Sequence, residues 1–311
     1  MIPRWHTGRI AAATPSDFNF WRTAFSHGWC DLLPFTFDEK QRTLRRVLET
    51  EAGTLVDCTV HSAGSGIVIN LRSPAPLTAA TRRSVLTQMR TCLRLGEDFK
   101  PFHAAARRHP RFRWIARTCS GPMLRAPTMF EDIVKMICTT NCTWALTKIM
   151  VTNLVRIAGR SLHDSVAAFP DASSIASLTE RRLRKEVKAG YRAPYVLELA
   201  ERVASGKLDV EAWRTSRLPT EELLGELRTV KGVGPYAAEN LLKLIGRYDR
   251  LGLDSWSRSR FYHLHSRGRR VKDATIWRHY EEYGEWRGLF FWLEMTRDWH
   301  DDKFPLSKEI S

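Results

Sequence analysis

A short glycine-rich segment carries the residue types that could bind a phosphate group. Residues 227–236 read Leu-Arg-Thr-Val-Lys-Gly-Val-Gly-Pro-Tyr. The two glycines can adopt positive φ angles and let an anion come close to the backbone. The proline suits the first position of a following helix, whose free N–H groups and dipole can then hold the anion. The predicted contacts to a nucleic-acid backbone are Lys231, Gly232, Val233 and Gly234.

This layout is that of a helix–hairpin–helix, a motif that grips DNA phosphates without reading the base sequence. Nucleotide-binding loops and plain helical hairpins share the Gly-x-Gly pattern, so the motif needs a second signal. Asp254 supplies one, because it follows Tyr236 by 18 residues, at the predicted start of another helix. A carboxylate there can stabilise positive charge on a sugar or activate water. It can also be a helix N-cap, and the two roles are compatible.

The composition favours a nucleic-acid partner. The chain of 311 residues has 49 lysines and arginines against 34 acidic residues, a formal net charge of +15 at pH 7. Thirty-seven of the basic residues are arginines, whose guanidinium groups bind phosphate oxygens in two-point geometry and stack on flat rings. An anionic membrane surface is the second candidate partner, and an arginine-rich proteome is a third explanation. The hydrophobic content of 43% excludes a mainly disordered chain.

The hydrophobic pattern predicts an α+β fold that is mainly α. Two β-rich runs, 54–60 and 67–72, are separated by a glycine–serine connection typical of a hairpin. The predicted helices are 77–95, 130–157 (as one long helix or two short ones), 179–189, 195–205, 221–229, 236–245 and the aromatic-rich 277–299. We therefore expect a small N-terminal antiparallel β domain with a flanking helix, residues 1–100. An all-helical domain, residues 101–311, should follow and carry the hairpin at about 219–246.

Further motifs resemble segments of one enzyme superfamily. Cys-Thr-Thr-Asn at 138–141 and Gly-Tyr-Arg-Ala-Pro-Tyr-Val at 190–196 resemble parts of the 8-oxoguanine DNA glycosylases. Leu-Gly-Glu-Asp-Phe-Lys-Pro-Phe-His at 95–103 resembles the interdomain stretch of bacterial alkyladenine-type glycosylases. With the hairpin and its aspartate, the chain resembles the helix–hairpin–helix (HhH-GPD) DNA glycosylase superfamily over about residues 95–300. The resemblance implies a hydrolase that flips a modified base out of double-stranded DNA and cleaves its N-glycosidic bond.

Three departures from the superfamily pattern refine this expectation. The bifunctional members have a lysine where this chain has Tyr236, and that lysine forms an imine with the sugar. Its absence here implies a monofunctional enzyme that leaves an abasic site. The superfamily's proline two residues before the aspartate is Gly252 in this chain. No cysteine follows Cys142, so the four-cysteine iron–sulfur loop of other relatives is absent and no such cofactor is expected.

The resemblance also implies roles for individual residues. Asp254 is the catalytic carboxylate, and Tyr236 faces the sugar. Asn141, Tyr191 and Arg192 fill the void left by the extracted nucleotide. A Na⁺ or K⁺ ion is implied on the backbone carbonyls of the hairpin residues Arg228, Val230 and Val233.

Asn240 lies one helical turn after Tyr236, so the two side chains share a helix face. Its amide can donate and accept, which suits a reader of a polar base edge; bracing of the hairpin is the alternative. Lys231 should point at phosphate, and Lys243 should be a solvated or phosphate-facing charge.

Two alternatives to a monofunctional glycosylase stay open. One is a bifunctional glycosylase and lyase that uses another lysine, and the other is a hairpin protein that binds DNA structure without chemistry. The base is equally open: an oxidised purine, an alkylated base, or a hypermodified pyrimidine of phage DNA in antiviral defence.

The remaining patterns indicate a monomer in the bacterial cytoplasm, acting on nucleoid DNA. No stretch approaches about 18 apolar residues, and the N-terminus has no secretory signal. Six scattered cysteines suit a reduced compartment. Cys138 and Cys142 indicate structural thiols rather than zinc ligands. His263 and His265 lack further metal ligands nearby in sequence.

Overall fold

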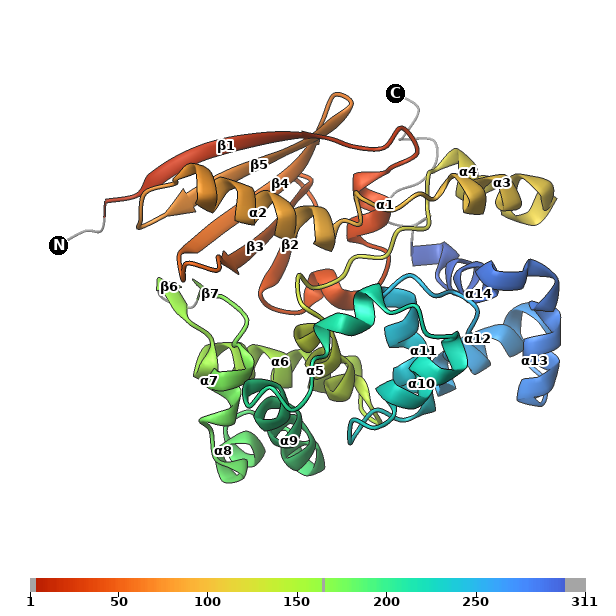
Figure 1. Ribbon diagram of the computed structural model, residues 1–311. Helices are drawn as coiled ribbons and strands as arrows, with labels where there is room; N and C mark the ends of the chain where they lie inside the picture. The colour runs from red at the N-terminus through yellow and green to blue at the C-terminus, as the bar shows by residue number, and fades with distance from the viewer. Residues whose placement is uncertain (1–3, 164–165, 300–311) are drawn as a thin grey trace.

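The N-terminal part of the chain is a five-stranded antiparallel sheet in the order β1-β5-β4-β3-β2 (Figure 1). A computed structural model describes residues 4–163 and 166–299; the ends of the two predicted domains, 1–3 and 300–311, lie outside the described residues. The strands are β1 (His6–Ala13), β2 (Phe35–Asp38), β3 (Thr43–Glu49), β4 (Leu55–Ala63) and β5 (Gly66–Ser73). With the helices below, this sheet confirms the predicted α+β, mainly α fold.

The predicted β-hairpin is formed by β4 and β5, and both strands are longer than the hydrophobic runs that predicted them. Ala63 pairs with Gly66, so only Gly64 and Ser65 form the turn, with Gly64 at a φ of 54°. The other three strands escaped the sequence pattern. β1 reads His-Thr-Gly-Arg-Ile-Ala-Ala-Ala, and glycine and alanine have low strand propensity.

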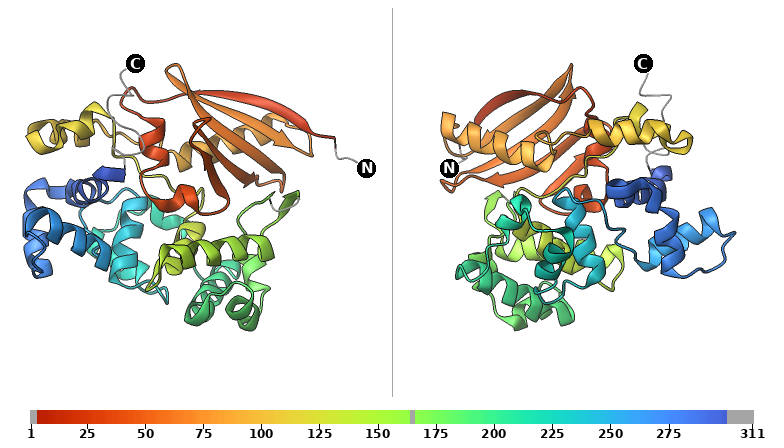
Figure 2. Two further views of the ribbon diagram at one scale, coloured as in Figure 1. Left: turned by 180° about the vertical axis from the view of Figure 1, so that it is seen from behind. Right: turned by 45° about the vertical axis from the view of Figure 1, so that its right-hand side comes forward.

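Helical segments connect the sheet to the rest of the molecule. They are α1 (Phe20–Ala24), the 3₁₀ turn η1 (Gly28–Asp31) and α2 (Ala79–Cys92). α2 lies across one face of the sheet, whereas α1 and η1 run from the sheet to the helical part (Figures 1 and 2). Thr78 caps α2 by accepting a hydrogen bond from the Thr81 amide.

The remainder of the described chain is almost entirely helical. Its elements are α3 (Lys100–Arg108), η2 (Pro110–Phe112), α4 (Arg113–Arg117), α5 (Met129–Thr139), α6 (Trp144–Ala158), β6 (Ser161–His163), β7 (Val166–Ala167), α7 (Ala172–Ala176), α8 (Glu180–Lys185), η3 (Gly190–Arg192), α9 (Ala193–Ala204), η4 (Glu211–Thr215), α10 (Thr220–Leu227), α11 (Pro235–Leu244), α12 (Ser255–His265), α13 (Asp273–His279), η5 (Glu281–Trp286) and α14 (Arg287–Met295).

Two predicted segments are divided. The segment 130–157 forms two helices, because the chain turns at Asn141, whose φ is 46°. The segment 277–299 is broken at Gly284, which has a φ of 56° and a non-helical ψ of −129°. No helix in the ranges 4–163 and 166–299 is long and apolar enough to span a membrane.

One large hydrophobic cluster runs from the sheet into the helices. It contains Val60 and Ile69 of the sheet, Met89 of α2, Leu241 of α11 and Phe290 of α14. The sheet and the helices therefore share a core.

A buried ion-pair cluster joins the sheet to α5. Both guanidinium N–H groups of Arg46 on β3 donate to the Glu131 carboxylate, at 3.0 and 2.6 Å. Lys135 Nζ lies 2.7 Å from the same carboxylate. Burial alone would raise the pKa of Glu131, but the two cations together lower it. The strand missed at 43–49 thus contributes a buried arginine, which its sequence pattern could not indicate.

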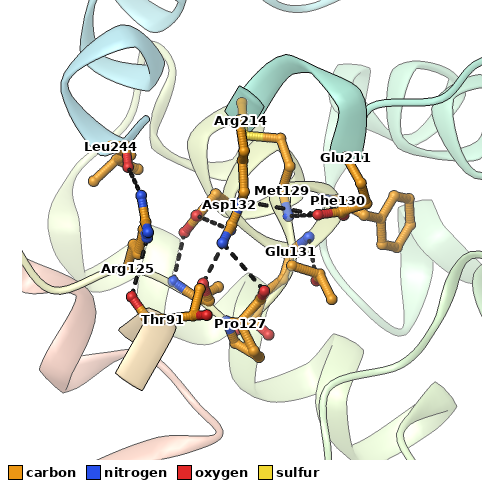
Figure 3. Close-up of polar contacts among 12 residues, drawn as sticks. Thr91, Arg125, Pro127, Met129, Phe130, Glu131, Asp132, Glu211, Arg214 and Leu244 are labelled. Atoms are coloured by element: carbon orange, nitrogen blue, oxygen red, sulfur yellow. Dashed lines mark hydrogen bonds and ion pairs between the residues drawn. The ribbon is translucent and has the colours of Figure 1, made fainter. Parts of the chain in front are cut away.

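Asp132, the next residue, organises the loop before α5 (Figure 3). Its carboxylate accepts hydrogen bonds from Trp29 Nε1 at 2.8 Å and from the Ala126 amide at 2.9 Å, and Arg214 Nη2 lies 3.0 Å away. Glu211 accepts from the first amides of α5, Met129 at 2.8 Å and Phe130 at 3.1 Å. These contacts fix the start of the helix that leads into the candidate site.

Replacing Arg46 with leucine should destabilise the protein by about 3–5 kcal/mol. Glu131 would keep only Lys135 as an ionic partner while still buried. Urea denaturation measures the loss. Arg182→Leu, which removes an exposed ion pair with Glu186, should leave stability almost unchanged; a similar loss in both variants would contradict the role of the buried cluster.

Candidate active site

The predicted hairpin is formed by α10, the turn 228–234 and α11. Gly232 has a φ of 88°, and a Cβ there would lie 2.8 Å from the Tyr195 ring, so the turn requires glycine. Gly234 is extended instead and is the N-cap of α11, with Pro235 at the first helical position. The first N–H groups of a helix have no partner within it, so this end of α11 can receive a phosphate.

A groove with a volume of about 850 Å³ runs past the hairpin turn. Its walls are the loop 139–142, the residues Tyr191 and Tyr195, the hairpin turn and the start of α12. Lys231, the predicted phosphate contact, lies at this groove with its Nζ 2.6 Å from Glu198 of α9. A phosphate at the hairpin would have to compete with that carboxylate for the ammonium group.

Asp254 is the N-cap of α12. Its Oδ1 accepts a hydrogen bond from the Ser257 amide at 2.7 Å, and its own amide donates to Ser257 Oγ at 2.9 Å. This reciprocal capping box fixes the carboxylate at the start of the helix. The half-buried side chain lines the groove and also a second, deeper cavity.

The second cavity has a volume of about 610 Å³ and largely aromatic walls. Its lining includes five tryptophans, Trp29, Trp144, Trp256, Trp292 and Trp299. Thr139, Cys142, Tyr236 and Asp254 line both the groove and this cavity. These four residues therefore mark the passage from one to the other.

Two titratable side chains in the cavity wall are neutral at physiological pH. Burial lowers the pKa of His27 to about 3; its Nε2 donates to the Leu124 carbonyl at 2.7 Å, and its Nδ1 accepts from the Trp29 amide. Burial and the negative charge of Asp254 raise the pKa of Tyr236 to about 12. A neutral imidazole and a neutral phenol thus line the same cavity as the Asp254 side chain.

Asn240 and Lys243 on α11 lie differently from what the sequence indicated. Asn240 lines the cavity, but its Nδ2 donates to the Tyr236 and Gly252 carbonyls, at 2.9 and 3.3 Å, and its Oδ1 accepts from Lys243 Nζ at 3.0 Å. These bonds favour the bracing role. Lys243 is fully buried, so the prediction of a solvated or phosphate-facing charge is wrong. Burial lowers its pKa to about 8.

Two of the three predicted void-filling residues, Asn141 and Tyr191, line the groove. Asn141 Nδ2 donates to the Tyr191 hydroxyl at 3.4 Å, and both side chains are exposed. Arg192, in contrast, is 4% exposed; its Nε donates to the Thr140 carbonyl at 3.1 Å and its guanidinium lies over the Tyr191 ring. Arg192 therefore supports the loop from behind, which leaves Asn141 and Tyr191 available to DNA.

The hairpin carbonyls and the cysteines are two kinds of possible metal ligand in this part of the molecule. Arg228, Val230 and Val233 all line the groove, and the Val230 carbonyl accepts from the Val233 amide at 3.0 Å. Carbonyl oxygens are suitable ligands for a hard cation, and an alkali ion on these residues stays a prediction. The described cysteines have free thiols; Cys138 is buried, as expected, and Cys142 is half-buried.

His265, the last residue of α12, belongs to a cluster with His279 and Glu294; their candidate ligand atoms lie within 4.8 Å of one another. Arg111 is hydrogen-bonded to both imidazoles, at 2.8 and 3.3 Å, and is paired with Glu294. Burial, His279 and Arg111 lower the pKa of His265 to about 4. A protein cation thus already occupies the centre of this cluster.

Sequence reasoning missed most of the cavity wall. His27 and Trp29 belong to the N-terminal part, far from the hairpin in sequence. The aromatic residues near the end of the predicted helix 277–299 were expected mainly in the core, with one or two of them stacking on a flipped base; Trp292 and Trp299 line the cavity. One signal was available in the sequence: Trp256 lies two residues after the aspartate and is therefore close to it in any fold.

Comparison with known proteins places this geometry in a structural class. No model of a protein family matches the chain, and no curated protein matches it in sequence. Among solved structures, MBOgg1 in complex with a low-affinity DNA ligand is 20% identical, with a TM-score of 0.69 over 95% of this chain and 99% of that one. The apo-form of Clostridium acetobutylicum 8-oxoguanine glycosylase/lyase is 19% identical, with a TM-score of 0.67 over 94% and 97%.

A 3-methyladenine DNA glycosylase from Archaeoglobus fulgidus is 16% identical, with a TM-score of 0.72 over 93% of this chain and 98% of that one. Both kinds of neighbour belong to one superfamily, and the match extends over nearly the whole chain, including the N-terminal sheet. The resemblance seen in the motifs is confirmed at the level of the fold: the chain has the fold of the helix–hairpin–helix (HhH-GPD) DNA glycosylases.

Proposed function

We propose that the protein is a monofunctional DNA glycosylase, which flips a modified base from double-stranded DNA, hydrolyses its N-glycosidic bond and leaves an abasic site. The observation that carries the proposal is the position of Asp254, at the passage between a groove beside the hairpin and an aromatic cavity. A nucleotide flipped from DNA held in the groove would bring its base into the cavity and its sugar beside this carboxylate.

The residues of the passage suit this reaction. Flipping costs a few kcal/mol of lost stacking and pairing, and tryptophan rings can return part of it by stacking on the base. As the glycosidic bond breaks, its electron pair leaves with the base and positive charge develops on the sugar. The Asp254 carboxylate, fixed by its capping bonds, stabilises that charge and orients the water that adds to the sugar.

The amines near the passage support the monofunctional form. Tyr236 occupies the place of the imine-forming lysine and has no amine. Lys243 is buried and bonded to Asn240 and to the Leu251 carbonyl. Lys231 is exposed on the hairpin turn and paired with Glu198. A bifunctional enzyme would need one of these lysines to leave its partners, and a purely DNA-binding protein would not need the cavity.

The dimensions of the cavity bear on the substrate. Pockets of about 300–1,000 Å³ enclose ligands larger than a bare aromatic ring, so about 610 Å³ leaves room for a base with a substituent. An oxidised purine, an alkylated base and a hypermodified pyrimidine of phage DNA are the candidate classes. We further expect the enzyme to act as a cytoplasmic monomer on nucleoid DNA.

Asp254→Asn should slow base release by several orders of magnitude and leave DNA affinity and protein stability unchanged. Asparagine can keep the helix cap, because its Oδ1 still accepts from the Ser257 amide, so only the charge is lost. The measurement is single-turnover base release from a panel of modified duplexes, with anisotropy for affinity. No release by the wild type from any duplex, or parallel loss of affinity and rate in the variant, would contradict the proposal.

Borohydride should fail to trap a covalent adduct between the wild-type protein and a cleavable duplex. An imine requires an amine at the sugar, and Tyr236 cannot supply one. Product strands should stay intact until alkali is added. Tyr236→Lys is the matched positive control, since it restores an amine at that helix position. Efficient trapping by the wild type would support the bifunctional alternative.

Glu198→Gln should strengthen nonspecific DNA binding by up to about fivefold. The Glu198 carboxylate would no longer compete with DNA for the Lys231 ammonium group, and an exposed ion pair of this kind contributes less than about 1 kcal/mol. Binding titrations over a range of salt concentrations measure the effect. Lys231→Gln should instead weaken binding and reduce the salt dependence by about one phosphate contact. If Glu198→Gln leaves DNA affinity unchanged while Lys231 is present, the hairpin does not use the Lys231 ammonium group to bind DNA.

A further inference from the structure

The turn that leads to Asp254 has a conformation that strongly favours glycine. Gly252 is buried and has a φ of 64°. A Cβ at this position would lie 2.6 Å from both Asn240 Nδ2 and Lys243 Nζ. Proline, which fixes φ near about −65°, could not adopt this conformation. The most flexible residue type therefore lies two residues before the candidate catalytic carboxylate.

Three side chains on α11 hold this flexible turn. The Glu239 carboxylate accepts a hydrogen bond from the Gly252 amide at 2.6 Å. Asn240 Nδ2 donates to the Gly252 carbonyl at 3.3 Å, and Lys243 Nζ donates to the Leu251 carbonyl at 2.7 Å. Both polar groups of the glycine are thus bonded to one helix. A further bond of 3.0 Å between Lys243 Nζ and Asn240 Oδ1 joins two of the three side chains.

We propose that Glu239, Asn240 and Lys243, here called the α11 bracket, are positioning residues that fix Asp254 relative to Tyr236 and the passage. α11 begins at the hairpin turn, so the same helix that would hold the DNA phosphate also holds the loop of the carboxylate. The bracket sets the distance between the bound backbone and the reacting sugar. Its catalytic consequence rests on the proposed function, whereas its contacts do not.

The chemistry of Lys243 supports a specific role over simple packing. Burying an ammonium group is costly, and replacing buried charges by apolar groups is often neutral or stabilising. Lys243 is buried, and within residues 4–163 and 166–299 its bonded partners are a carbonyl and an amide oxygen, while Glu239 and Asp254 favour its charged form. Methionine would fill the same volume without that cost. The need to hold the Leu251 carbonyl at the base of the turn explains why this residue is a lysine.

The bracket can be tested first without catalysis, through the exchange of the Gly252 amide hydrogen measured by NMR. Glu239→Leu removes its acceptor, and Lys243→Met frees the adjoining carbonyl, so both should speed exchange at Gly252 relative to core amides of the sheet. Glu239→Gln keeps an acceptor oxygen and should retain most of the protection. Lys135→Met, the matched loss of a buried lysine paired with Glu131, should not change exchange at Gly252 relative to those core amides.

The second measurement is single-turnover base release with saturating enzyme. Lys243→Met and Glu239→Leu should slow release by about 10- to 100-fold, since misplacement by about 1 Å can cost that much, with DNA affinity unchanged. Glu239→Gln should restore most of the rate. In an Asp254→Asn background, Lys243→Met should cause no further loss, because it acts through that carboxylate.

Three results would overturn the proposal. The first is unchanged Gly252 exchange in both Glu239→Leu and Lys243→Met. The second is a rate loss from Lys243→Met that multiplies with the loss from Asp254→Asn, and the third is a rate loss of the same size in Lys135→Met. If the wild type releases no base from any duplex, the proposed function fails, while the exchange experiment still decides whether the bracket holds the turn.

Discussion

The hydrogen bonds between α11 and the Gly252 turn are the constraint on which the candidate site depends. Through them one helix meets two demands at different points along its length. Its N-terminus, opened by Gly234 and Pro235, presents amide groups to the groove. Its middle binds the backbone that leads to Asp254. A helix of ten residues thereby fixes the spacing between the proposed phosphate site and the carboxylate.

The support of this helix comes from the N-terminal half of the chain. Arg94, which follows α2, donates to the Leu244 carbonyl at 2.7 Å, and Arg125 donates to the same carbonyl at 3.0 Å. Cationic side chains at the last carbonyls of a helix complement its dipole. The sheet is bound in turn to α5 by Arg46 and Glu131. Rigidity at the site is thus a property of the whole fold.

Local sequence predicted the parts of this arrangement that depend on local chemistry. The hairpin glycine, its proline and the helices around them follow from backbone geometry, and α10 and α11 begin and end within a few residues of the expected bounds. Lys243 and Arg192 could not be predicted, because their polarity indicates solvent and only tertiary contacts reveal their buried partners. The strands β1 and β3 were missed for a similar reason: alanines and arginines form strands here because their neighbours bury them.

The aromatic cavity draws on both ends of the chain. His27 and Trp29 come from the first 30 residues, Trp292 comes from α14, and the indole N–H of Trp292 donates to the Ser26 carbonyl at 2.8 Å. During synthesis on the ribosome, the hairpin and Asp254 emerge before this wall can form. The hairpin is therefore synthesised before the part of the cavity wall that α14 supplies. The cavity can be completed only once α14 has been made and has packed against Ser26.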